Sequence, residues 1–507
     1  MKRSPQPNLP PRRGSATFPQ ASLLALGVSL LAATLFSSGC ATKSPPTVAE
    51  IHAQSGTLTN FALTNAWRAG GLAGTTIDNW LVTFQDDQLL ALVAEAITNN
   101  LDLRVTASRV AQAAQYVEMA KAALRPAVSL LGTGGLNMGG GDVSSALQGA
   151  SLGASWEPDL WARMRYARNA AQAAHASAEA DFEFSRQALA GSVAKGWFLA
   201  SETLLQRELA EAMVQASQEL ATLADKRWQI GAGSQQDVAL ARAHLATVQD
   251  GLRQIQLAHD QNLRALELLL GRYPAAELEA RHDLPPLPGP VPAGLPIDML
   301  ERRPDMVAAE RRVAAAFNRV GEAKAARLPR LILNANVAVI DSDILQLKDD
   351  FENPTGGVGG RLIAPIYQGG ALQTQVRIRT LEQEEAIAEY ARMALRALGE
   401  VEDNLAAGQV LTEREGLLQQ ALAENQHALE LAQTSYRVGQ SDLRAVQQQL
   451  LAVHSARLAL LRVRGEQLIQ RVNLHLALGG DFTSPVELPE SEGAAESGLR
   501  TAMQAAQ

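Results

Sequence analysis

The chain has 507 residues, of which 47% are hydrophobic but only 4% aromatic, and its formal net charge is −8. So few aromatic side chains are unusual for a compact core and typical of long helices that pack through Ala and Leu. The negative charge, with no basic stripe to neutralise phosphates, argues against a nucleic-acid partner.

The chain begins with the pattern of a bacterial lipoprotein signal. A basic segment precedes the apolar run from Ala21 to Phe36, and Ser37-Ser38-Gly39-Cys40 follows. Cys40 is the only cysteine, and the small residues before it resemble a lipobox, although Ser37 stands where Leu is usual. We expect the Cys40 sulfur to carry a diacylglycerol, and Ala41 after it favours sorting to the outer membrane. The alternative is an ordinary signal peptide with an incidental cysteine.

Residues 40–79 are rich in Thr, Ser, Ala and Gly, and we expect an extended tether there. From Trp80 to Arg125 apolar residues recur at a spacing of three and four, which predicts a helix that Pro126 ends. No segment after the signal has some twenty continuous apolar residues, so the sequence predicts no transmembrane helix. Any crossing of a bilayer must then use strands.

A β-hairpin is predicted after each of two helix-ending prolines, at 126–158 and 329–365. Within the second hairpin, apolar residues such as Leu331 and Leu333 alternate with a set that includes Asn334. This period of two suits a barrel strand between lipid and water. Four strands cannot close a barrel alone, because the smallest barrels have about eight. A small soluble hairpin is the alternative.

A long helical stretch is predicted after each hairpin, at 160–229 and 371–437. Each stretch of about 70 residues would span about 100 Å, far more than a globular domain needs. Turns at Gly231 and Gly439 reverse the chain, and a second helix runs back from each turn. The strand-bearing and turn-bearing ends should therefore lie far apart.

These elements belong to an internal duplication. Gly231 and Gly439 are 208 residues apart, and the segments after them match without a gap, whereas Pro126 and Pro329 are 203 apart. A repeat this long indicates two similar halves rather than a solenoid. The sequence therefore predicts a signal peptide 1–39, a tether 40–79, repeat one 80–271 with long helices 160–270, a Pro-rich linker 272–302, repeat two 303–480 with long helices 371–478, and a flexible tail 481–507.

Motifs of known catalytic chemistry are missing from the sequence. It contains no nucleophile motif, HExxH, CxxC or P-loop, and its eight histidines lack the spacing of metal ligands. We therefore expect no enzyme activity, no metal site and no cofactor.

Five strings of residues carry a family resemblance. The segment Leu295–Met306, which contains Arg-Arg-Pro-Asp, and the later Gly321–Lys324 resemble the mid-chain signature of TolC-like outer-membrane efflux factors. The likeness is greatest to their lipoprotein branch, of the OprM and NodT type. Trp156–Trp161 and Ala364–Gly370 are similar to that family's strand-to-helix junctions, and Tyr436–Asp442 is similar to its second helical turn.

The resemblance implies an α+β membrane protein that forms a homotrimer. Three copies of four strands would close a 12-stranded β-barrel in outer-membrane lipid, continued by a periplasmic α-helical barrel made from both repeats. Such proteins are passive exit ducts for drugs or other small toxic compounds, docked to a periplasmic adaptor and an inner-membrane pump, here expected to be of the RND type. The alternatives are a periplasm-spanning structural lipoprotein and a duct for secreted polypeptides.

The resemblance also directs attention to the periplasmic tip. Relatives often narrow it with an apolar ring and an acidic ring, and the matching positions here are Arg444 and Gln448, neither of the usual type. Asp442 could pair with Arg444 across the trimer and hold the tip shut, or it could simply cap the returning helix. The candidate adaptor contacts, whose aromatic members could equally pack between hairpins, are Arg227, Trp228, Gly231, Tyr436 and Gly439.

Overall fold

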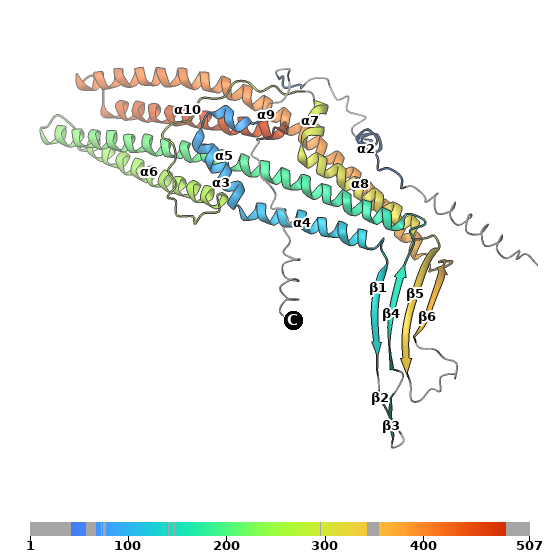
Figure 1. Ribbon diagram of the computed structural model, residues 1–507. Helices are drawn as coiled ribbons and strands as arrows, with labels where there is room; N and C mark the ends of the chain where they lie inside the picture. The colour runs from blue at the N-terminus through green and yellow to red at the C-terminus, as the bar shows by residue number, and fades with distance from the viewer. Residues whose placement is uncertain are drawn as a thin grey trace, which may run out of the picture. The chain divides into compact units, whose positions relative to one another are not determined.

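The computed structural model describes residues 42–56, 67–71, 74, 78–134, 136–139, 142–145, 148–294, 296–341 and 354–482, so Cys40, the signal peptide and most of the tail lie outside it. Figure 1 shows the elements along the chain. Their bounds are α2 Val48–Ser55, the 3₁₀-helix η1 Trp80–Phe84, α3 Asp87–Asn99, α4 Leu101–Ala122, β1 Ala127–Thr133, β2 Leu136–Gly139, β3 Asp142–Ser145, β4 Gln148–Trp156, α5 Arg163–Gln229, α6 Gln235–Leu269, α7 Pro296–Arg302, α8 Pro304–Ala325, β5 Arg330–Asp341, β6 Thr355–Ile363, α9 Ala371–Arg437 and α10 Leu443–Ala477.

The chain forms two compact units. A strand unit takes Ala122–Ala167 and Gly321–Val376 together with the N-terminal segment, and a helical unit takes the remainder. In the part of the chain that the structure describes, no helix is both long and apolar enough to cross a bilayer.

The strand unit contains a four-stranded antiparallel sheet in the order β1-β4-β5-β6 (Figure 1). Each repeat supplies two of these strands, as the sequence predicts. Within the predicted hairpin 126–158, the first repeat adds a separate two-stranded ribbon of β2 and β3, which the sequence did not predict. Gly139 and Asp142 are the last paired residues of that ribbon.

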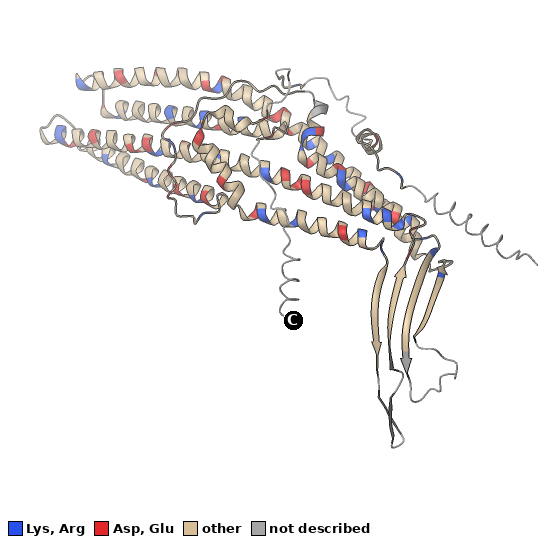
Figure 2. Cartoon of the chain, viewed as in Figure 1, with Lys and Arg blue, Asp and Glu red and all other residues tan. Residues whose placement is uncertain are grey.

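The sheet has one apolar and one polar face, which confirms the predicted alternation. Leu130 pairs with Leu152, and Leu152 with Val337, so these three side chains share a face. They are 76%, 54% and 51% exposed. The opposite face carries mainly small and polar residues such as Ser151 and Asn336, with a few apolar ones such as Leu131 and Ile332. Figure 2 shows the strands almost free of charge.

The long helices repeat with equal lengths, which confirms the duplication. Helices α5 and α9 each have 67 residues, and α6 and α10 each have 35. In each pair the second copy begins and ends 208 residues after the first, the offset that the two turn glycines predict.

Three stretches differ from their sequence-based predictions. The single helix expected from Trp80 to Arg125 is broken into η1, α3 and α4. The Asp86 side chain starts α3 by accepting from Leu89 N at 3.0 Å, and the Asn100 side chain starts α4 by accepting from Leu103 N at 3.0 Å. The expected tether contains α2, which a capping box of Thr47 and Glu50 begins. The expected linker contains α7.

Among the described residues the helical unit has three apolar cores. One surrounds the fully buried Trp80 and Trp197, from η1 and α5, a second surrounds Tyr390 of α9, and a third contains Tyr436. Between α5 and α10, the Glu202 carboxylate lies so close to Gly465 that a Cβ there would meet it at 2.2 Å. Burial raises the pKa of Glu202 to about 7, against the smaller lowering effect of the hydrogen bond from Gln206.

Four helices end in the same way. At Gly231, Gly271, Gly439 and Gly479 the chain has a positive φ between 69° and 79°. At Gly271 the next residue's N–H donates to Glu267 O at 2.9 Å, and Gly271 N–H donates to Leu268 O at 3.1 Å. This pair of bonds is the Schellman motif, which satisfies the last carbonyls of a helix. The sequence predicts the turns at Gly231 and Gly439.

We predict that Gly271→Ala destabilises the protein more than Gly231→Ala. Both substitutions place an L-residue at positive φ, which costs about 1–2 kcal/mol. Only at Gly271 would the new Cβ also meet a backbone atom, Asn99 O, at 2.9 Å, whereas Gly231 has nothing within 4 Å. The resulting backbone shift should cost about 1 kcal/mol more.

The measurement is the urea midpoint of the loss of helical circular dichroism in detergent. Gly439→Ala is a second control, because its new Cβ would also meet nothing within 4 Å. Equal losses in all three variants would contradict the close approach of α3 to the end of α6.

Candidate functional site

The predicted tip residues lie where α5 turns into α6 and where α9 turns into α10. The two turns differ in how the returning helix starts. Ser234 begins α6 with a capping box to Asp237, whose N–H donates to the Ser234 hydroxyl at 3.1 Å. Asp442, 208 residues later, begins α10 by accepting from Ala445 N at 3.0 Å.

Asp442 also forms an ion pair with Arg444 of the same chain. The Arg444 Nε lies 3.3 Å from Asp442 Oδ2, and the two side chains are 65% and 53% exposed. An exposed pair of this kind contributes at most about 1 kcal/mol. Gln448 is exposed one helical turn after Arg444. The structure therefore shows the capping role of Asp442, and both charges remain available to a neighbouring chain.

Arg227 and Tyr436 meet between the two helical hairpins. The Arg227 guanidinium lies 4.5 Å from the centre of the Tyr436 ring, and its Nη1 donates to Tyr436 O at 3.5 Å. Tyr436 is buried among apolar residues of all four helices, including Ala224, Val238 and Leu443. In this chain Tyr436 therefore packs between the two hairpins.

Trp228 differs from its repeat partner Tyr436. It is 49% exposed, beside Gly231, which closes the end of α5. An exposed tryptophan at a helix turn has the large apolar surface of an interface anchor. Of the predicted adaptor contacts, Trp228 is the one whose side chain the fold leaves open.

A buried arginine at the start of α8, Arg303 of the Arg-Arg-Pro-Asp string, forms a second centre that the sequence did not predict. Arg303 Nη2 donates to Asp305 at 2.8 Å, and its Nη1 donates to Glu400 of α9 at 2.9 Å and to Ala477 O of α10 at 3.2 Å. Burial by itself lowers the pKa of Arg303, but the hydrogen bonds and charges of Asp305 and Glu400 outweigh it and raise the pKa. The string Arg-Arg-Pro-Asp was the signal that could have located this centre.

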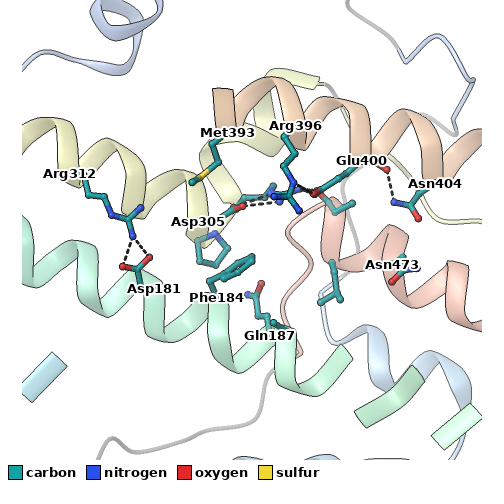
Figure 3. Close-up of a pocket in the computed structure, with 15 residues that line it drawn as sticks. Asp181, Phe184, Gln187, Asp305, Arg312, Met393, Arg396, Glu400, Asn404 and Asn473 are labelled. Carbon is teal, nitrogen blue, oxygen red and sulfur yellow. Dashed lines mark hydrogen bonds and ion pairs between the residues drawn. The ribbon is translucent and has the colours of Figure 1, made fainter. Parts of the chain in front are cut away.

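A cleft of about 560 Å³ adjoins Arg303. Figure 3 shows that two carboxylates of the cleft already have arginine partners. Arg312 donates to Asp181 at 2.5 Å, and Arg396 donates to Glu400 at 3.0 Å. Its remaining lining includes Phe184 and other apolar side chains. Among the described residues no group of three or more His, Cys, Asp or Glu side chains could hold a metal ion. The charged side chains that line the cleft therefore connect neighbouring helices, rather than providing a free base or a set of metal ligands.

The sequence and fold match known proteins over both repeats. The family model described as outer membrane efflux protein matches residues 92–272 and 295–480. The chain is 30% identical over 418 residues to the probable efflux pump outer membrane protein TtgC of Pseudomonas putida, covering 80% of this chain and 85% of that protein. It is also 30% identical over 477 residues to the pyoverdine export outer membrane protein OpmQ of Pseudomonas putida, covering 91% and 97%.

A solved structure shares the fold. The outer membrane protein VceC from Vibrio cholerae matches with a TM-score of 0.73 and 25% identity, covering 81% of this chain and 100% of that chain. These matches confirm the resemblance and the fold class that the sequence predicts.

We predict that Arg303→Ala strongly destabilises the helical unit. It would leave Asp305 and Glu400 without their shared cation, and removal of one partner from a buried pair costs about 3–5 kcal/mol. The neighbouring Arg302 provides the matched control, because its partner Asp78 has a side chain that is 56% exposed. Arg302→Ala should cost about 1 kcal/mol or less.

Urea unfolding followed by circular dichroism measures both effects. Arg303→Lys should recover only part of the loss, because an ammonium cannot reproduce the two-pronged contact with Asp305. Similar small losses for the Arg302 and Arg303 variants would show that the buried network does not hold the helices together.

Proposed function

The chain belongs to the outer membrane efflux protein family, and we propose that it is the exit duct of a tripartite efflux system. In this proposal three copies form a duct that conducts drugs or other small toxic compounds to the exterior. A periplasmic adaptor and an inner-membrane pump of the RND type would deliver the compounds and supply the energy. The duct itself would act passively.

The observation that carries this proposal is the four-stranded sheet with an exposed apolar face. Large side chains such as Leu130 and Val358 are 76% and 90% exposed, which is costly in water and favourable in lipid. The order β1-β4-β5-β6 leaves β1 and β6 with one neighbour each. Pairing β6 of one copy with β1 of the next would satisfy both edges and close 12 strands around a threefold axis.

The relatives support the class of cargo. TtgC is named a probable efflux pump outer membrane protein, and OpmQ a pyoverdine export outer membrane protein. Both names describe outer membrane proteins of export, one in an efflux pump and one for pyoverdine. A purely structural spacer, by contrast, has no use for a sheet with an exposed apolar face.

The proposed membrane attachment includes an acyl anchor at Cys40. Support comes from the sequence alone, since this cysteine lies outside the described residues. An acyl chain would add about 0.8 kcal/mol of burial for each methylene. We predict that the mature protein carries a diacylglycerol at Cys40 and that Cys40→Ser abolishes it, as mass spectrometry of the N-terminal peptide would show. An unmodified Cys40 in the wild type would refute the anchor.

We further propose that the duct is narrowest at the turns that contain Gly231 and Gly439. Asp442 and Arg444 would pair between neighbouring chains there, with Gln448 one turn behind, and Trp228 would contact the adaptor together with Arg227. The exposure of Asp442, Arg444 and Gln448 supports this role.

We predict that Asp442→Ser increases the single-channel conductance of the protein in planar bilayers. Serine preserves the helix cap, as Ser234 does in the first repeat, but removes the charge that pairs with Arg444. Arg444→Ala should have the same effect. Ser234→Ala is the matched control: it should destabilise its helix by about 1 kcal/mol without changing conductance.

Two results would count against these proposals separately. If neither the wild type nor the two tip variants conducts ions, the chain is not a duct, and a structural spacer becomes the better interpretation. If the wild type and Asp442→Ser conduct equally, Asp442 is only a helix cap.

A further inference from the structure

Two arginines interrupt the otherwise uncharged polar face of the sheet. Arg330 is the first residue of β5 and lies opposite Ile363 of β6, while Arg361 lies opposite Ile332. Residues that are opposite each other, or two apart on one strand, share a face. Arg330 and Arg361 are therefore diagonal neighbours on one face, with Cα atoms roughly 7–8 Å apart.

The register places both arginines on the face opposite the exposed apolar one. Leu331 pairs with Leu362, and Leu333 pairs with Gly360, so the apolar positions of β5 and β6 alternate with the two arginines. If the apolar face contacts lipid, the arginine face lines the lumen. This step depends on the proposed function, in which three sheets close a barrel.

The two guanidinium groups have no carboxylate partner in the part of the strand unit that the structure describes. Arg330 borders a hollow of about 260 Å³, but the carboxylates beside it, Glu157 and Asp159, pair with Arg163 and Arg165 at 2.9 and 3.2 Å. Arg330 and Arg361 are both exposed.

The charges come from the second repeat alone. By strand register the first-repeat position that corresponds to Arg330 is Ala127, and the one that corresponds to Arg361 is Gly153. Neither carries a charge. Asp341, at the opposite end of β5, is 11 residues and roughly 36 Å from Arg330.

We propose that Arg330 and Arg361 form a cationic ring inside the barrel, two guanidinium groups from each of three chains, that selects anionic solutes. The ring lies at the end of the strands nearest the helices, so a solute arriving from the helical side meets it before the rest of the barrel. Rings of Arg or Lys are how pores favour anions. Low-dielectric walls focus their field and concentrate counter-ions within the lumen.

The test is the reversal potential of single channels in planar bilayers under a potassium chloride gradient. We expect the wild type to be anion-selective. Arg330→Gln with Arg361→Gln should lower the chloride-to-potassium permeability ratio by a factor on the order of ten. Arg330→Glu with Arg361→Glu should make the channel cation-selective.

Arg330→Lys with Arg361→Lys is the matched control, because it keeps the charge and alters only the side-chain shape. It should retain the wild-type reversal potential. A channel whose reversal potential is the same in the wild type, the glutamine variant and the glutamate variant would overturn the ring, while its conductance would leave the proposed duct intact. A complete absence of conductance would instead refute the duct.

Discussion

The structure depends on where its long helices stop. Their sequences are Ala-, Leu- and Gln-rich, and nothing in that composition limits a helix to 67 or 35 residues. The limits come from four glycines at positive φ, each closing a helix with the same pair of backbone bonds. Because the glycines recur at a fixed offset, both hairpins have the same length. Their ends therefore meet in register, and Arg227 can pack on Tyr436.

The same glycines make close packing possible at the other end of the hairpins. A Cβ at Gly479 would lie 3.2 Å from Arg303 Cγ, so the end of α10 lies directly against the buried guanidinium. Arg303 in turn binds Asp305, Glu400 and Ala477 O. The Arg-Arg-Pro-Asp signature therefore connects α8, α9 and α10 through Arg303. These bonds hold both helices of the second hairpin at their base.

The sequence predicted the features that local rules decide. Turn glycines, helix-stopping prolines and strand alternation each act within a few residues, so the long helices and the sheet could be placed from them. Contacts between distant residues could not be predicted. Asn100 breaks the first helix partly through a bond to Leu269 O, and Glu202 fits only because Gly465 lies opposite it. At the tip, the burial of Tyr436 comes from the packing of four helices, which no local pattern in the sequence predicts.

The two repeats of this chain share their backbone geometry but differ in the chemistry of exposed side chains. Backbone constraints must be kept in both copies, since a changed helix stop would put the hairpins out of register. Side chains that face open space carry no such requirement, and there the copies diverge: Ser234 against Asp442, Ala127 against Arg330, and Gly153 against Arg361. All three changes add a charge in the second copy. In a threefold assembly of two repeats, a charge found in only one copy alternates around the axis, so neighbouring like charges stand further apart and repel less.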